Sequence, residues 1–159
     1  MLEKIKTRLP GGIYFNDLLI IIKDFIKGRF TFYDRYLLDT YFIGNSYAID
    51  KLYNTLSKQY LDNNYLNFKG IKIFDLKNDS INARGAFIGE FFDFIYPYLF
   101  NDYSYVHGEG PYLYQNVQIN KGDVVIDAGA NIGLFSALAS FLGGIVYAFE
   151  PVKETREKY

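Results

Sequence analysis

The stretch VVIDAGANIGLFSALASFLGGIVYAFEP, from Val124 to Pro151, has the clearest structural pattern in the sequence. Its first residues, Val124–Asp127, are almost continuously apolar, which is typical of a strand buried on both faces of a parallel sheet. A second apolar run, Ile145–Glu150, has the same character. Two strands joined by a helical crossover of the usual right-handed sense lie parallel. The stretch therefore predicts a βαβ unit, and with it an α/β fold.

The segment between the two strands has the apolar spacing of a helix. This helix is expected to begin near Asn131 or Ile132 and to stop at Gly143 and Gly144. Pro151 is expected to end the second strand and to start the next helix at its first position. The buried face of the helix is predicted to comprise Ile132, Phe135, Leu138, Ala139 and Leu142.

Polar residues stand where the two predicted strands end. Asp127 closes the first strand, and Glu150 closes the second 23 positions later. The carboxyl ends of parallel strands form the ligand-binding edge of such sheets. Gly129 is expected to allow a sharp turn and a close ligand, and Gly133 to let the helix pack close to the strand. The N–H groups at the helix start favour an anion, and Glu150 can accept hydrogen bonds from both vicinal hydroxyls of a ribose.

The glycine pattern argues against a dinucleotide ligand. The G-x-G-x-x-G fingerprint of nicotinamide enzymes requires glycines at the positions of Asn131 and Leu134, and neither is present. The pattern D-x-G-x-N-x-G suits a ligand that brings one carboxylate and one amine to the turn, with Asp127 facing the amine. S-adenosylmethionine (SAM) is such a ligand, and its ribose would lie at Glu150. A nicotinamide-dependent oxidoreductase is the less favoured class.

Two adjoining segments also resemble a known family. The sequence GDVVIDAGANIGLFSALAS…GIVYAFEP, with the preceding HGEGPYLYQNVQINKGD, is similar to the FkbM family of class I SAM-dependent methyltransferases. The resemblance implies a Rossmann-like fold that methylates a hydroxyl of a sugar, glycan or other small metabolite. It implies that Glu150 binds the ribose, and it identifies no catalytic residue. The cofactor-binding residues it implies are Asp127, Gly129, Ala130, Asn131, Gly133, Glu150 and Glu109, with Tyr112 near the same pocket.

The sequence also departs from that family. The family's sheet continues beyond the A-F-E-P strand, whereas this sequence ends at Tyr159, inside what looks like the next helix. We therefore expect an incomplete Rossmann-like fold, residues 121–159, preceded by a mainly helical, aromatic-rich region, residues 1–120. Such an N-terminal fragment is expected to bind SAM weakly or not at all, to show no turnover, and to aggregate through exposed strand edges. The alternative is a non-catalytic remnant or interaction module with a vestigial nucleoside-binding turn, for which self-association stays open.

The composition excludes several classes of function. The 159 residues include 17 basic and 18 acidic side chains, a net charge of −1, so the electrostatic footprint of a nucleic-acid-binding protein is absent. The sequence has no Cys and one His, His107, which excludes thiolate and multi-His metal sites. The apolar run Leu18–Ile26 is too short to span a bilayer, and no signal peptide is evident. We expect no transmembrane segment and a cytoplasmic location.

The region before Asp123 predicts mixed elements. A first helix is expected between an N-cap at Asn16 and a terminating Gly28, and Asn and Gly residues between 61 and 70 predict turns. Further helices are predicted over Tyr47–Tyr60 and over Arg84–Phe100, with strands over Ile71–Leu76 and Val117–Ile119. The apolar faces are predicted to be Leu18, Leu19, Ile22, Phe25 and Ile26 in the first helix, and Ile49, Leu52, Tyr53 and Leu56 in the second.

The helix over Arg84–Phe100 carries two further expectations. Pro97 is expected to end or kink it. The run Phe91–Phe100 predicts core packing, whereas Glu90 and Asp93, three positions apart, are expected on a solvated face.

Overall fold

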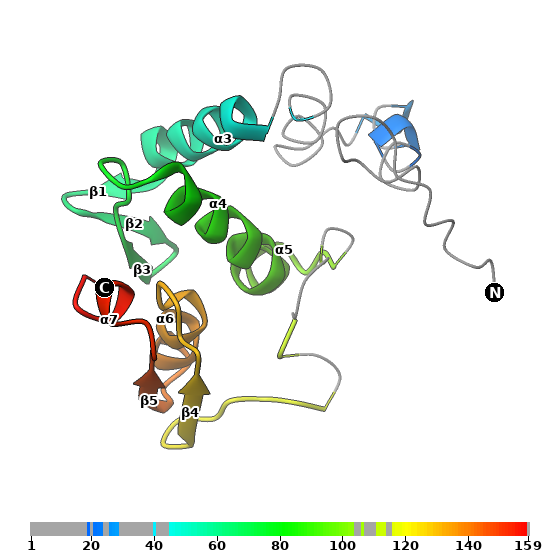
Figure 1. The fold of residues 1–159 in the computed structure, drawn as a ribbon. Helices are drawn as coiled ribbons and strands as arrows, with labels where there is room; N and C mark the ends of the chain where they lie inside the picture. The colour runs from blue at the N-terminus through cyan, green and yellow to red at the C-terminus, as the bar shows by residue number, and fades with distance from the viewer. Residues whose placement is uncertain are drawn as a thin grey trace. The chain divides into compact units, whose positions relative to one another are not determined.

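A computed structural model describes most of the chain (Figure 1). It describes residues 19, 21–23, 26–28, 40, 45–103, 106, 111–113 and 116–158. The chain divides into two compact units, Met1–Thr55 and Leu56–Tyr159. Helices, an antiparallel sheet and a parallel strand pair make the class α/β.

The described residues before Asn45 correct the first predicted apolar face. Ile21 is buried, whereas Leu19, Ile22 and Ile26 are exposed. Gly28 adopts the left-handed backbone, with φ of 66°, that a residue ending a helix commonly has. Asn16, Leu18 and Phe25 lie outside the described residues.

Helix α3, Asn45–Tyr60, confirms the second predicted helix with a start two residues earlier. All four residues of its predicted apolar face, Ile49, Leu52, Tyr53 and Leu56, are buried. The spacing of large apolar residues was therefore sufficient to identify this element and its inner face.

The segment predicted as turns contains two strands. Strands β1 (Leu61–Asp62), β2 (Tyr65–Phe68) and β3 (Ile71–Phe74) form an antiparallel sheet in the order β1-β2-β3. Lys69 and Gly70 between β2 and β3 both have positive φ, as a two-residue hairpin loop of type I′ requires. Strands β1 and β2 were not predicted, because the Asn and Gly residues lie close together and the alternation of side chains in β2 is only four residues long.

The third predicted helix is one continuous helical run with a wider middle. It consists of α4 (Ile81–Glu90), the π-helix η1 (Phe91–Ile95) and α5 (Tyr96–Phe100). Ser80 caps its start, because the Ala83 N–H donates to Ser80 Oγ at 3.2 Å. Pro97 does not end the run, since it lies in the first turn of α5, where a proline's missing N–H is tolerated.

Buried aromatic rings join this helical run to the antiparallel sheet. The ring of Phe68 in β2 lies 4.9 Å from that of Phe91 in η1, and Phe91 stacks on Phe87 of α4 at 5.9 Å. The predicted core role of the aromatic run is confirmed for its first half, whereas Tyr98 and Phe100 are exposed. Asp93 is only 9% exposed, so its predicted place on a solvated face is wrong.

The predicted βαβ unit is present. Strands β4 (Val124–Ala128) and β5 (Ile145–Phe149) pair in parallel, with Val124 opposite Ile145, and α6 (Leu134–Phe141) connects them. Helix α6 begins later than predicted, because Asn131 and Gly133 have positive φ and cannot belong to a right-handed helix. The last helix, α7 (Lys153–Arg156), has Val152 as its N-cap, so Pro151 lies outside it.

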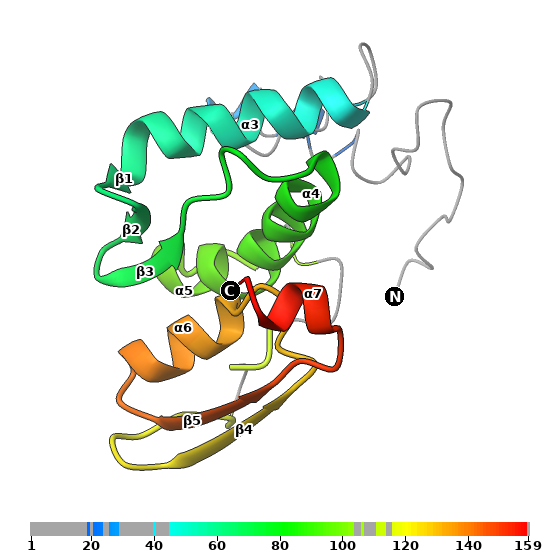
Figure 2. The same cartoon turned by 60° about the vertical axis from the view of Figure 1, so that its left-hand side comes forward.

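One face of the parallel strand pair is uncovered among the described residues. Figure 2 shows α6 on one side of β4 and β5. On the opposite side Val124 is 65% exposed and Ile126 is 70% exposed. Ile145, Tyr147 and Phe149 are exposed beside them. The predicted burial on both faces is therefore wrong for this pair.

Two remaining expectations concern regular structure. Residues 117–119 form no strand, so the predicted short strand at Val117–Ile119 is wrong, and a turn at Lys121 and Gly122 precedes β4. Within the described part of the chain, no helix combines the length and the apolar character that crossing a membrane requires.

Candidate functional site

The turn between β4 and α6 is fixed to the end of β5 by backbone hydrogen bonds. The N–H groups of Gly129 and Ala130 both donate to the carbonyl oxygen of Phe149, at 2.7 and 3.1 Å. The Gly133 N–H donates to the Ala130 carbonyl at 2.8 Å. The turn is thus held over the carboxyl ends of both strands, which is the edge where α/β sheets bind ligands.

The glycines of this turn are required by backbone conformation. Gly129 has φ of 87° and Gly133 has φ of 82°. A Cβ atom added at either position would meet nothing within 4 Å. The predicted close packing of helix on strand at Gly133 is therefore wrong, and the left-handed backbone is the reason for glycine there.

Glu150 lies against the turn, as its place at the end of the neighbouring strand predicts. Its Oε2 accepts a hydrogen bond from the Asn131 backbone N–H at 2.8 Å. Its Oε1 accepts from the Val152 N–H at 2.7 Å. Two backbone N–H groups, one in the turn and one after β5, therefore orient this carboxylate.

Asp127 is buried beneath the turn. It is 8% exposed, and the hydroxyl of Ser136 in α6 donates to its Oδ2 at 2.6 Å. The carboxylate is therefore oriented by the helix that follows the turn. Ser136 lies within the stretch Val124–Pro151, but its role depends on where α6 begins. The start predicted from the sequence is too early.

No pattern in the sequence indicates that Glu90 belongs to this site. Its Oε1 accepts a hydrogen bond from the side-chain amide of Asn131 at 2.5 Å. The two residues are 41 positions apart, and no local pattern connects them. The expectation of a solvated Glu90 is corrected accordingly, because its carboxylate is partly buried against the turn.

Two cavities flank the turn. One, of about 460 Å³, is lined by Gly133, Ser136 and Glu150 together with β3 residues. The other, of about 680 Å³, is lined by Asp127 and Gly129 together with residues of the α4–η1 run. Ala130 and Asn131 line both cavities. Asp127 and Glu150 therefore adjoin the same turn but face different cavities.

The two cavities differ in charge. Lys72, Arg156 and Lys158 line the smaller one beside Glu150. Arg156 donates to the Glu150 carbonyl at 3.0 Å, and the ammonium of Lys158 is paired with Asp79. Among the described residues, the larger cavity is lined by the carboxyl side chains Glu90, Asp93 and Asp127 and by no Lys or Arg. It therefore favours a cationic group.

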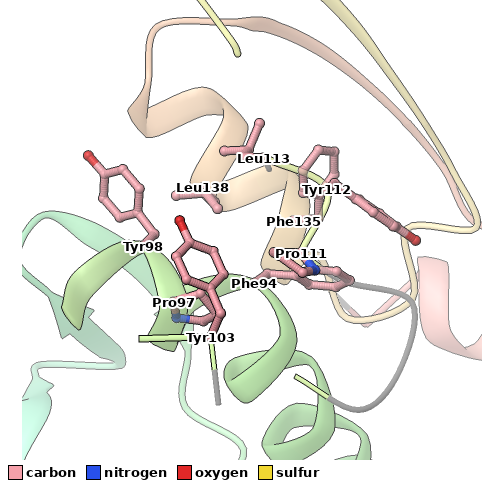
Figure 3. A pocket seen from close by; sticks show the side chains of 9 residues that line it. All are labelled: Phe94, Pro97, Tyr98, Tyr103, Pro111, Tyr112, Leu113, Phe135 and Leu138. Atoms are coloured by element: carbon pink, nitrogen blue, oxygen red, sulfur yellow. The ribbon is translucent and has the colours of Figure 1, made fainter. Parts of the chain in front are cut away.

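A third, small cavity of about 40 Å³ adjoins the larger one (Figure 3). Aromatic, proline and leucine side chains from η1, α5, α6 and residues 103 and 111–113 surround it. The ring of Tyr112 lies 4.9 Å from that of Phe135 and 4.8 Å from that of Phe94, and all three line the larger cavity as well. Tyr112 thus lines the same cavity as Asp127.

Two residues considered from the sequence, Glu109 and His107, lie outside the described residues. Among the residues that are described, no three His, Cys, Asp or Glu side chains are grouped as a metal site would require. No family model, curated protein or solved structure matches this chain.

Proposed function

We propose that this chain carries the SAM-binding turn of an FkbM-type class I methyltransferase. The observation that carries the proposal is the hydrogen bond between the Asn131 N–H and the Glu150 carboxylate at 2.8 Å. It joins the glycine turn to the acid that the proposal assigns to the ribose. The acceptor would be a hydroxyl of a sugar, glycan or small metabolite, and the proposed fold is Rossmann-like.

Glu150 is suited to two vicinal hydroxyls. Each of its carboxylate oxygens accepts one backbone N–H, from Asn131 and Val152. A carboxylate oxygen offers two lone-pair sites, so each keeps capacity for one hydroxyl donor. Hydrogen bonds to a charged acceptor contribute more than neutral ones, about 1.5–3 kcal/mol each. Glu150 would therefore supply much of the affinity for a nucleoside.

The larger cavity suits the other end of SAM. That end carries an ammonium, a sulfonium and a carboxylate and so has a net charge of +1, and the carboxyl side chains of Glu90, Asp93 and Asp127 line the cavity. The aromatic rings of Tyr112 and Phe135 also line it, and such rings attract cations. Cavities of about 460 and 680 Å³ lie within the range of about 300–1,000 Å³ that is usual for small-molecule sites.

The proposed methyl transfer depends mainly on how the protein positions the ligand. Bound SAM supplies a sulfonium methyl group that a hydroxyl oxygen can displace in line. Asp127, held by Ser136, and the turn at Gly129–Gly133 would orient the ligand. Effective molarity from such orientation is a large part of catalysis of this kind.

Isothermal calorimetry with SAM, S-methylmethionine and NADH tests the proposal. We expect SAM to bind wild-type protein weakly but saturably. Glu150→Ala should weaken this binding by at least about tenfold, since a tenfold change corresponds to only about 1.4 kcal/mol. S-methylmethionine, which has the sulfonium but no ribose, should bind both proteins equally.

The matched control is Glu154→Ala, which removes an exposed carboxylate from α7 and should leave the affinity for SAM unchanged. NADH should produce no heat with any of these proteins. Absence of SAM binding to the wild type, or equal SAM binding by wild type and Glu150→Ala, would exclude the proposed role of the turn.

An interaction module is the second candidate function, favoured by the uncovered apolar face of β4 and β5. Parallel sheets are nearly always covered on both faces. Val124, Ile126, Tyr147 and Phe149 are nevertheless all exposed. Saturable binding of SAM would favour the methyltransferase, whereas concentration-dependent association without SAM binding would favour the module.

A further inference from the structure

Asn131 holds together two parts of the site that are distant in sequence. Its side-chain amide donates to Oε1 of Glu90, and its backbone N–H donates to Oε2 of Glu150 at 2.8 Å. The hydrogen bonds run from one residue to two carboxylates. A change in the orientation of Asn131 would therefore disturb its hydrogen bonds to both carboxylates.

The backbone of Asn131 adopts a conformation that requires support. Its φ is 49°, in the left-handed region, which non-glycine residues visit rarely and Asn more readily than most. A side-chain hydrogen bond to a fixed acceptor is one way to stabilise that conformation. Glu90 is such an acceptor, since it is the last residue of α4 and continues directly into η1.

The helical run that carries Glu90 is firmly placed against the βαβ unit. Both α4 and η1 pack on α6. In η1 the side chains of Phe91, Phe92 and Ile95 are buried, and the ring of Phe94 lies 5.7 Å from that of Phe135 in α6. Glu90 therefore reaches the turn from a packed element, not from a loop.

We propose that Glu90 is a positioning residue for the glycine turn. Through its hydrogen bond to the Asn131 amide it holds Asn131 in the left-handed conformation, and the Asn131 N–H in turn orients the Glu150 carboxylate. For ligand binding this inference rests on the proposed function. The positioning itself is a property of the ligand-free chain and can be measured separately.

A donor–acceptor swap tests the inference. Glu90→Gln keeps an oxygen acceptor for the Asn131 amide and should weaken SAM binding less than Glu90→Ala does, which should weaken it by about tenfold. Asn131→Asp opposes two carboxylates and should also weaken it by about tenfold. The double variant Glu90→Gln/Asn131→Asp reverses donor and acceptor, because the Gln amide can donate to the Asp carboxylate, and should regain most of the loss.

Hydrogen exchange of the Asn131 backbone N–H in the ligand-free chain is the second measurement. This N–H should exchange about tenfold faster in Glu90→Ala and Asn131→Asp than in wild type, and near the wild-type rate in Glu90→Gln and in the double variant. Thermal melting of each variant identifies any that is unfolded. The swapped pair tests the inference even if Glu90→Ala does not fold.

The two measurements separate the inference from the proposed function. If wild-type protein binds no SAM but the exchange rates follow the expected order, the function fails and the positioning role stands. Unchanged exchange of the Asn131 N–H in Glu90→Ala, or a double variant no better than Asn131→Asp, would overturn the role of Glu90.

Discussion

At the scale of single residues, backbone dihedral angles define the turn. Gly129, Asn131 and Gly133 alternate with ordinary residues and all have positive φ. This alternation turns the chain back over the end of β5 and delays the start of α6 to Leu134. The sequence indicates the position of the turn through its glycines, and the left-handed Asn131 explains why glycine is not needed at every such position.

The requirement for glycine can be tested with two alanine substitutions of opposite expected sign. Gly133→Ala should destabilise the fold by about 1–2 kcal/mol, because φ is 82° while the added Cβ meets nothing. Gly89→Ala, inside α4 and equally open, should stabilise it by about 0.5–1 kcal/mol. Urea denaturation of both variants measures the two shifts, and equal effects of the same sign would refute the conformational explanation.

The buried carboxylate of Asp127 should depend on Ser136. Ser136→Ala removes the hydroxyl that donates to Oδ2 at 2.6 Å, so stability should fall by about 1–3 kcal/mol. Ser140→Ala, on the same helix but exposed, should change stability by less than about 0.5 kcal/mol. Chemical denaturation distinguishes the two, and a neutral Ser136→Ala would mean that Asp127 does not rely on this bond.

At the scale of elements, the alternation within the antiparallel sheet decides which residues form the core. In β2 and β3 the side chains of Leu66, Phe68, Ile71 and Ile73 are buried, while Tyr65, Lys72 and Phe74 are exposed. The inner face meets the aromatic rings of α4 and η1 through Phe68. This sheet and the helical run therefore share one aromatic core.

Two phenylalanines of the sheet should respond differently to truncation. Phe68→Ala should lower stability by about 3–5 kcal/mol, because Phe68 is fully buried among aromatic rings. Phe74→Ala, 47% exposed on the other face, should lower it by about 1 kcal/mol or less. Guanidinium titrations of both variants measure these losses of stability. Comparable losses would contradict the assignment of Phe68 to the buried face of the sheet and of Phe74 to the exposed face.

Some elements could be predicted from local sequence patterns and others could not. The helix at Tyr47–Tyr60, the strand at Ile71 and the βαβ unit could be predicted, because each depends on apolar periodicity over adjacent residues. Strand β2, the passage of the helical run through Pro97 and the burial of Asp93 could not be. These three features depend, in that order, on a short strand pairing, a π-helical turn and a tertiary contact. None of these leaves a periodic signal in the sequence.

At the scale of the whole molecule, long-range contacts complete the candidate site. The position of Glu150 beside the turn could be predicted from the sequence, because parallel strands end at a common edge of the sheet. The position of Glu90 could not be predicted, since its contact with Asn131 depends on how the α4–η1 run packs against α6. Nor could it show that Asp127 and Glu150 line separate cavities, which depends on side-chain orientation at the turn.

The uncovered face of β4 and β5 should promote self-association. Ile126 and Tyr147 are opposite each other on this face and both are exposed. Ile126→Lys should lower the association constant by about tenfold or more, with little effect on folding because the side chain is exposed. Phe74→Lys, which alters an exposed residue of the antiparallel sheet, is the control. Sedimentation equilibrium that finds wild type and Ile126→Lys identical would exclude this face as the contact.

The most direct test of the central claim is a titration of ¹⁵N-labelled protein with SAM, followed by ¹H–¹⁵N correlation spectra. The claim is that the turn and Glu150 bind one nucleoside ligand together. We expect the amide signals of Gly129, Asn131, Gly133 and Glu150 to shift along a single saturating curve. Unchanged signals at all four residues, or shifts confined to other parts of the chain, would contradict the assignment.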